Sequence, residues 1–149
     1  MRSLVWRRLD EPGMEIVHVE SLDRAEGTQI GVTYELRWRL DGERLELVIV
    51  GGTRRVVELG DADFFDVFAS AFFNSLPVVR DGLLEAGSPR DYVMEFVGVP
   101  ALTTRRSAQR YTPKGDRVVG YASGTYSADI EFDADGFVLH YDGFLERIG

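Results

Sequence analysis

Hydrophobic and polar residues alternate strictly over residues 30–40. The apolar positions are Ile30, Val32, Tyr34, Leu36, Trp38 and Leu40, and polar or charged residues separate most of them. A period of two over this length predicts a β-strand with one buried face. Asp41-Gly42 follows directly and favours a two-residue hairpin turn, because both central positions of such a turn require a positive φ. Residues 28–50 therefore predict a β-hairpin.

The C-terminal third repeats this pattern. Residues 125–133 alternate in the same way and lead into Asp135-Gly136, which predicts a second turn. Ser123-Gly124 predicts a tight hairpin before it, and the Pro-Lys-Gly-Asp segment 113–116 predicts another. Residues 105–141 are thus expected to form four sequential antiparallel strands, a β-meander.

The turn positions also predict which residues face each other across the strands. The expected pairs are Trp38–Leu45, Leu36–Leu47, Tyr121–Tyr126, Ile130–Tyr141 and Phe132–Leu139. Each pair joins apolar or aromatic residues, so one face of each hairpin is expected to be buried.

The middle of the chain does not follow the period-two rule. Asn74 or Ser75 could cap a short helix with Pro77 in its first turn and Gly87 after its end. The same stretch could instead form a strand, a bend and a second strand. We expect at least one helical turn here.

These elements predict a mainly β domain spanning residues 1–149. Further strands are expected at residues 14–22, 53–59 and 92–99. About nine strands, with one short helical or irregular insertion near residues 62–86, favour a strongly curved antiparallel sheet that forms an incomplete barrel. The interior of such a shell must be filled by side chains or by a ligand.

Composition removes several classes of function. The 149 residues contain no cysteine and two histidines, His18 and His140, so neither a metal site nor a cofactor is expected. The formal net charge of −8 argues against nucleic-acid binding. No segment approaches the roughly 18 apolar residues of a membrane span, and the charged N-terminus does not resemble a signal peptide. We expect a cytoplasmic protein without stable membrane insertion.

The basic residues are almost all arginine. Lys114 is the single lysine among 17 basic residues. Arginine suits planar, bidentate contacts with anions. The bias is compatible with an anionic head group of a ligand, but a genomic composition bias explains it equally well.

Three short motifs resemble known sites but lack the required context. Residues 131–142 place acids like a calcium loop, yet their flanks alternate like strands rather than helices. GYASG at 120–124 has its serine one position late for a nucleophile elbow. Asp61, Asp63 and Asp66 could pair for acid–base chemistry, but solvated turn carboxylates are commoner.

The aromatic insertion is the strongest anomaly of composition. It contains Phe64, Phe65, Phe68, Phe72 and Phe73 within ten residues. These rings could plug the core of the curved sheet or line a ligand site. The two roles do not exclude each other.

Four segments, in order along nearly the whole chain, resemble a known family. They are VWRRLDEPGME (5–15), FFNSLPVVR (72–80), QRY (109–111) and YASGTYSADIEFDADGFVLHY (121–141). Together they resemble the bacterial family called putative glycolipid-binding proteins, formerly a domain of unknown function. The chain has Val79 where many members carry a second arginine, so Arg80 alone matches.

The resemblance implies a fold similar to lipoprotein localisation factors and a glycolipid-type ligand. On this hypothesis an acyl or otherwise apolar group packs against Trp6, Trp38, Phe72, Phe73 and Tyr141. The polar head contacts Asn74, Arg80, Gln109 and Tyr111. Tyr34, Tyr121 and Tyr126 could serve as well.

Two other functions remain open. The first is an enzyme of glycolipid or sugar metabolism, with a polar cluster around Asn74 and Arg80. Against it, no nucleophile–base pair can be identified in the sequence. The second is a structural or scaffold domain with a filled interior, whose exposed strand edges pair into a homodimer.

Overall fold

The computed structural model describes residues 2–10, 13–19, 26–30, 35–68, 70–85 and 87–149, with the backbone alone over 26–30. Thirteen strands, one short 3-10 helix and one short α-helix form in these residues. Tyr34 lies outside them. The expectation of a mainly β fold is confirmed.

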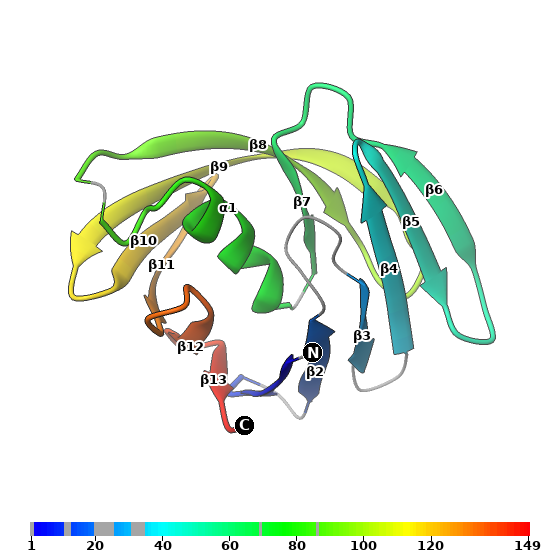
Figure 1. Ribbon diagram of the computed structural model, residues 1–149, viewed down its shortest axis with the longest axis horizontal. Coiled ribbons are helices and arrows are strands. Elements are labelled where there is room, and N and C mark those ends of the chain that lie inside the picture. The colour runs from blue at the N-terminus through cyan, green and yellow to red at the C-terminus, as the bar shows by residue number, and fades with distance from the viewer. Residues whose placement is uncertain (1, 11–12, 20–25, 31–34, 69, 86) are drawn as a thin grey trace.

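Nine strands form one curved sheet around α1 (Ser75–Arg80) (Figure 1). In spatial order they are β2 (Met14–Val19), β1 (Arg2–Arg8), β13 (Leu145–Arg147), β12 (Val138–Tyr141), β11 (Tyr126–Phe132), β10 (Val118–Ser123), β9 (Thr104–Gly115), β8 (Arg90–Val97) and β7 (Phe64–Val67). All neighbours are antiparallel except β7 and β8, which are parallel. The sheet is therefore mixed rather than purely antiparallel, and it is not closed into a barrel.

A second sheet of four strands contains the N-terminal hairpin. Its order is β3 (Glu26–Ile30), β4 (Glu35–Asp41), β5 (Arg44–Ile49) and β6 (Arg54–Glu58). β3 lies close to β2, so this sheet continues the curve of the large one (Figure 1). The predicted hairpin over residues 28–50 is thus present, with β4 and β5 as its clearest pair.

The register of two predicted hairpins is wrong by two residues. Trp38 faces Leu47 rather than Leu45, and Tyr121 faces Ala128 rather than Tyr126. The glycines of the two turns, with φ of +61° and +59°, occupy the first central position instead of the second. This is the glycine position of a type II′ turn, which shifts the pairing by two and leaves each side chain on its expected face.

The C-terminal meander is confirmed, with two local departures. Ile130 faces Tyr141 as predicted, but an irregularity after Glu131 places Phe132 opposite Val138 instead of Leu139. The β9–β10 turn lies at residues 116–117, which have φ of +53° and +60°, rather than within 113–116.

The predicted helical insertion is also confirmed. A 3-10 turn, η1 (Phe72–Asn74), leads directly into α1. Asn74 occupies the N-cap position without a capping side-chain hydrogen bond, and Pro77 lies in the first turn. Gly82, with a φ of +60°, follows the helix end, so it takes the role expected of Gly87.

Aromatic side chains fill much of the space between the sheets and the helical insertion. Trp38 packs against Phe72 and Phe73 with ring centroids 5.6 Å and 5.1 Å apart. Phe73 also contacts Phe65 at 4.7 Å. All four side chains are at least 98% buried. Four rings of the aromatic insertion therefore form a core plug, as one of the two interpretations held, whereas Phe68 is 52% exposed.

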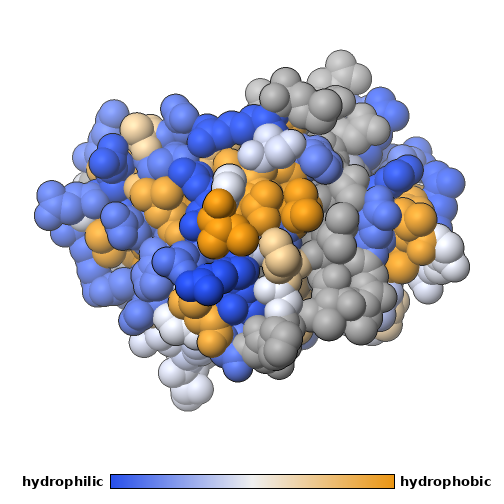
Figure 2. Space-filling model, turned by 90° about the horizontal axis from the view of Figure 1, so that it is seen from below, coloured by the Kyte–Doolittle hydropathy of each residue, from blue (hydrophilic) through white to orange (hydrophobic). Residues whose placement is uncertain are grey.

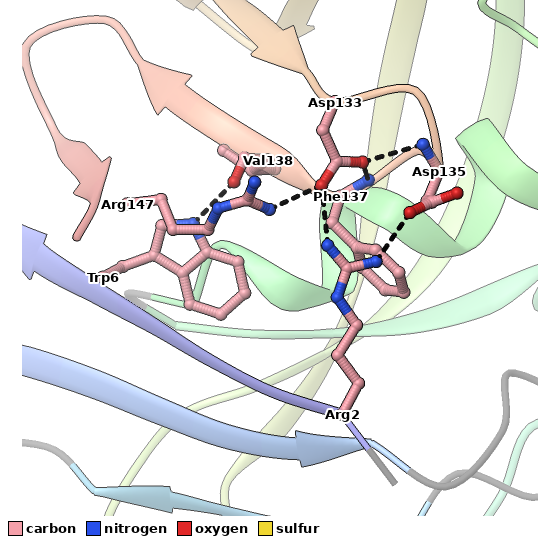
Figure 3. Close-up of polar contacts among 7 residues, drawn as sticks. All are labelled: Arg2, Trp6, Asp133, Asp135, Phe137, Val138 and Arg147. Carbon is pink, nitrogen blue, oxygen red and sulfur yellow. Dashed lines mark hydrogen bonds and ion pairs between the residues drawn. The ribbon is translucent and has the colours of Figure 1, made fainter. Parts of the chain in front are cut away.

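Residues near both chain ends contact the turn after β11, where the carboxylate of Asp133 accepts four hydrogen bonds (Figure 3). Its carboxylate accepts hydrogen bonds from Arg147 Nη1 at 2.6 Å and Arg2 Nη2 at 3.1 Å. The backbone amides of Asp135 and Phe137 donate at 2.9 Å and 3.0 Å. Beside it, Trp6 Nε1 donates to the Val138 carbonyl at 2.8 Å. Strands from both ends of the chain are thus joined to one turn.

Among the described residues, no helix has the length and apolar character needed to cross a bilayer.

Candidate functional site

A pocket of about 410 Å³ opens beside the helical insertion. Its lining comes from the first strand, from β7 and the segment after it, from β8, and from the β10–β13 meander. The lining residues are Arg8, Asp10, Asp66, Val67, Phe68, Ser70, Asn74, Phe96, Tyr121, Tyr126, Tyr141, Gly143 and Phe144. Its volume lies within the range of small-molecule sites.

Asp66 provides a buried carboxylate in this lining. It lies on β7, where the parallel pairing with β8 places it opposite Phe96, and only 7% of its surface is exposed. Gln109 Nε2 donates to its Oδ2 at 2.9 Å, and the Val67 amide donates to its Oδ1 at 2.9 Å. Burial raises the pKa of Asp66 from 3.8 to about 6, although both hydrogen bonds act in the opposite direction. Asp66 therefore changes its protonation state close to neutral pH.

A hydrogen-bonded chain of uncharged side chains continues from Gln109. Tyr111 Oη lies 3.5 Å from Gln109 Oε1, and Asn74 Nδ2 donates to Tyr111 Oη at 3.0 Å. Gln109 Nε2 also lies 3.4 Å from Ser107 Oγ. The three side chains of this chain are almost fully buried. The network fixes the side chain of Asn74 where α1 begins, at the wall of the pocket.

Tyrosine rings form a continuous wall next to this network. Tyr121 contacts Tyr111, Tyr126 and Tyr141 with centroid distances of 5.5, 6.2 and 6.1 Å. Burial raises the pKa of Tyr121 and Tyr141 above the ordinary range, with the nearby charge of Asp66 as a further cause for Tyr121 and a hydrogen bond with Tyr126 as a further cause for Tyr141. Both hydroxyls stay protonated at neutral pH and can donate hydrogen bonds.

Ser70 adds a buried hydroxyl to the lining. Its side chain is 4% exposed and belongs to the lining. Within the described part of the chain, its Oγ has no hydrogen-bond partner. A buried hydroxyl in this state is uncommon, because desolvation without a compensating bond costs about 1–3 kcal/mol.

The outer part of the pocket is aromatic and accessible. Phe68 and Tyr126 are 52% and 48% exposed. Arg8 lies over the ring of Phe144 at 4.8 Å and binds Asp10 through two hydrogen bonds of 2.8 Å. The pocket thus combines a polar, buried base with an aromatic rim.

The structure separates the predicted ligand residues into three groups. Asn74, Tyr121 and Tyr141 line the pocket. Gln109 and Tyr111 stand behind its wall and are joined to it by hydrogen bonds. The four remaining aromatic residues, Trp6, Trp38, Phe72 and Phe73, pack in the core with at most 2% exposure.

Arg80 does not lie where the predicted polar cluster around Asn74 and Arg80 would place it. It lies at the last turn of α1, is exposed, and places its guanidinium over the ring of Phe64 at 5.5 Å. It is not part of the pocket lining.

Sequence reasoning missed four polar members of the lining, Arg8, Asp10, Asp66 and Ser70. Asp66 was expected to be a solvated turn carboxylate, but it lies on a buried strand. Its position between Phe65 and Val67 in an apolar run is the signal that could have identified it. Ser70 carries no comparable signal in the sequence.

The described side chains contain no group of three or more His, Asp or Glu residues arranged to hold a metal ion.

Comparison with known proteins gives two matches. A family model described as Putative glycolipid-binding matches residues 28–147. The fold is similar to the crystal structure of a DUF1089 family protein from Pseudomonas aeruginosa, with a TM-score of 0.61 and 20% sequence identity over 99% of this chain and 94% of that one. A search of curated proteins finds no match.

Proposed function

Because the chain belongs to the putative glycolipid-binding family, we propose that it binds an amphipathic, glycolipid-like molecule in the pocket beside α1. The observation that carries this proposal is the arrangement of the lining. Polar groups that can hydrogen-bond a head group are buried at the base, and aromatic side chains that can contact an apolar chain are exposed at the rim. Few classes of small molecule need both surfaces in one site.

The distribution of surface hydrophobicity supports an amphipathic ligand. Figure 2 shows a face on which hydrophobic residues gather near the centre, with hydrophilic residues above them, below them and to their left. An apolar patch with a polar border is typical of interaction sites. Each CH₂ group removed from water contributes about 0.8 kcal/mol, so even a partly covered alkyl chain adds appreciable affinity.

Binding can be tested with n-octyl-β-D-glucoside below its micelle concentration, by isothermal titration calorimetry. We expect saturable binding to the wild type. Phe68→Ala, which removes an exposed ring of the rim, is expected to weaken binding about tenfold, because roughly 1–2 kcal/mol of apolar contact is lost. Val56→Ala is the matched control, since Val56 is similarly exposed and lies outside the lining.

The filled core also supports the scaffold alternative. The aromatic residues that could have lined a hollow interior pack against one another instead. If no alkyl glycoside binds, and protein purified from cells carries no small molecule in native mass spectrometry, the scaffold function replaces the binding function.

An enzyme acting on a glycosidic bond is the second candidate, and Asp66 favours it. A buried carboxyl with a pKa of about 6 has the property required of a general acid. Asp10, a second carboxylate of the lining, is held in a bidentate pair by Arg8. This pairing makes Asp10 less available as a nucleophile or base, so binding ranks first. Release of nitrophenol from 4-nitrophenyl glycosides, abolished in Asp66→Asn, would establish the enzyme instead.

A further inference from the structure

Building on the proposed function, we infer that the pocket selects a neutral, hydroxyl-rich head group over an anionic one. We further infer that the head group lies at the buried base of the pocket and that the apolar chain extends outward past Phe68 and Tyr126.

The charges of the lining disfavour an anion. The lining holds two carboxylates, Asp66 and Asp10, and one guanidinium, Arg8, which gives a formal sum of −2 + 1 = −1 with both acids ionised. Arg8 is bound to Asp10 by two parallel hydrogen bonds of 2.8 Å. A phosphate or sulfate would have to compete with Asp10 for the charge of Arg8, in a pocket that also holds Asp66. Like charges at short range in a poorly solvated site repel strongly.

One further arginine lies near the pocket without lining it. Arg105 places its guanidinium over the ring of Phe96 at 4.6 Å and is exposed to solvent. Phe96 belongs to the lining and Arg105 does not. Its charge is therefore more strongly screened than that of the buried Asp66.

The hydrogen-bonding groups at the base suit hydroxyls. Each oxygen of Asp66 accepts one hydrogen bond from the protein, and a carboxylate offers about four acceptor positions in total. The hydroxyl of Ser70 can both donate and accept, and it has no partner among the described residues. A sugar hydroxyl also donates and accepts, so it can satisfy both groups. A phosphate oxygen accepts only and cannot donate to Asp66.

The gradient of exposure sets the orientation. Asp66, Ser70 and Asn74 are each less than 8% exposed, whereas Phe68 and Tyr126 are about half exposed. A ligand that places its hydroxyls against the first group can extend its chain along the second. A longer chain then continues past these two exposed rings toward solvent.

The head-group preference is tested by calorimetry at pH 8 with two amphiphiles that share one chain, n-octyl-β-D-glucoside and octyl phosphate. We expect the glucoside to bind at least tenfold more tightly. Equal or tighter binding of octyl phosphate would overturn the inference while leaving the proposed function intact. If neither compound binds, the proposed function itself fails.

Two pairs of variants, each a change in the pocket lining with a matched control outside it, test where the head group binds. Ser70→Ala is expected to weaken glucoside binding about fivefold, the effect of one hydrogen bond. Ser75→Ala is its control, because the buried Ser75 hydroxyl also has no partner among the described residues but lies outside the lining. Neither change removes a protein hydrogen bond among the described residues, so both variants should fold. Asp66→Asn is expected to reduce the ratio of the affinities for octyl glucoside and octyl phosphate. Asp61→Asn, at an exposed carboxylate, should leave this ratio unchanged.

Further outcomes are equally decisive. Identical affinities in Ser70→Ala and Ser75→Ala would show that the head group does not reach the base. A fall in affinity from octyl to dodecyl glucoside would show that the chain, not the head, occupies the closed end of the pocket. Equal or tighter dodecyl binding supports the orientation inferred here.

Discussion

The side-chain amide of Gln109 donates a 2.9 Å hydrogen bond to the carboxylate of Asp66, a residue 43 positions earlier in the chain. Both side chains are more than 90% buried. The amide stabilises the ionised carboxylate, yet desolvation dominates and raises the pKa of Asp66 to about 6. The pair therefore holds a carboxyl that is costly to ionise inside the folded protein.

Asp66→Asn is expected to change how stability depends on pH. The folded pKa of about 6 exceeds the ordinary value of 3.8, so the folded state binds the proton more tightly than the unfolded state. Relative to Asp66→Asn, the wild type should gain about 2 kcal/mol between pH 8 and pH 4, with most of the gain between pH 6 and pH 4. Urea denaturation across this pH range measures it. Asp61→Asn, at an exposed site, should follow the wild type, and a parallel Asp66→Asn curve would contradict the assignment.

The two tryptophans of the core offer a matched comparison. Trp6 Nε1 donates to the Val138 carbonyl at 2.8 Å, whereas Trp38 Nε1 has no partner among the described residues. Both rings are at least 98% buried. Changing either to Phe removes the same volume, but Trp6→Phe also breaks a hydrogen bond. We expect Trp6→Phe to cost about 1 kcal/mol more in free energy of unfolding, measured by urea denaturation. Equal losses would show that the bond adds nothing.

The sequence predicts faces of strands better than their pairing. Side chains alternate with a period of two, so Trp38 could be assigned to the buried face without knowing its partner. A turn centred on Asp41-Gly42 and one centred on Gly42-Glu43 differ by two residues of register. Both keep Trp38 on the same face, so the hydrophobic pattern cannot distinguish them. The turn geometry decides, with Gly42 at the first central position.

The base of the pocket was harder to predict, because its contacts join distant segments. Asn74 and Tyr111 were assigned to one ligand site through family resemblance, and they are hydrogen-bonded at 3.0 Å. Asp66 was not assigned to the ligand site, because its burial depends on the parallel pairing of β7 with β8. Neither local propensity nor hydrophobic period contains that information.

Tyr111→Phe tests the buried network behind the pocket wall. The change keeps the ring and removes the hydroxyl that accepts from Asn74 Nδ2. We expect a loss of about 1–3 kcal/mol in unfolding free energy, because the buried amide of Asn74 loses its partner. Thermal and urea denaturation measure the loss. Arg80→Ala is the comparison: Arg80 is exposed over Phe64, so its loss should stay below about 1 kcal/mol. A larger loss of unfolding free energy in Arg80→Ala than in Tyr111→Phe would contradict this prediction.

Asp133 is expected to contribute more to stability than its neighbour Asp135. Asp133 accepts from Arg147, Arg2 and two backbone amides, whereas the exposed Asp135 carboxylate pairs with Arg2 at 2.8 Å. Asp133→Asn should cost about 2 kcal/mol, because an amide NH₂ then faces a guanidinium. Asp135→Asn should cost less than about 1 kcal/mol. Urea denaturation at pH 7 measures both.

The pH dependence gives a separate check on Asp133. Partial burial acts to raise the pKa of this carboxyl, but the hydrogen bonds from Arg147 and from the amides of Phe137 and Asp135 outweigh it, so the pKa is lowered from 3.8. A lowered folded pKa means that the stabilisation is present above pH 3.8 and is lost as the pH falls through the folded value. The difference between wild type and Asp133→Asn should therefore shrink in acid below pH 3.8. A difference that stays constant there would mean that side-chain shape, rather than the charge of Asp133, joins the two ends of the chain.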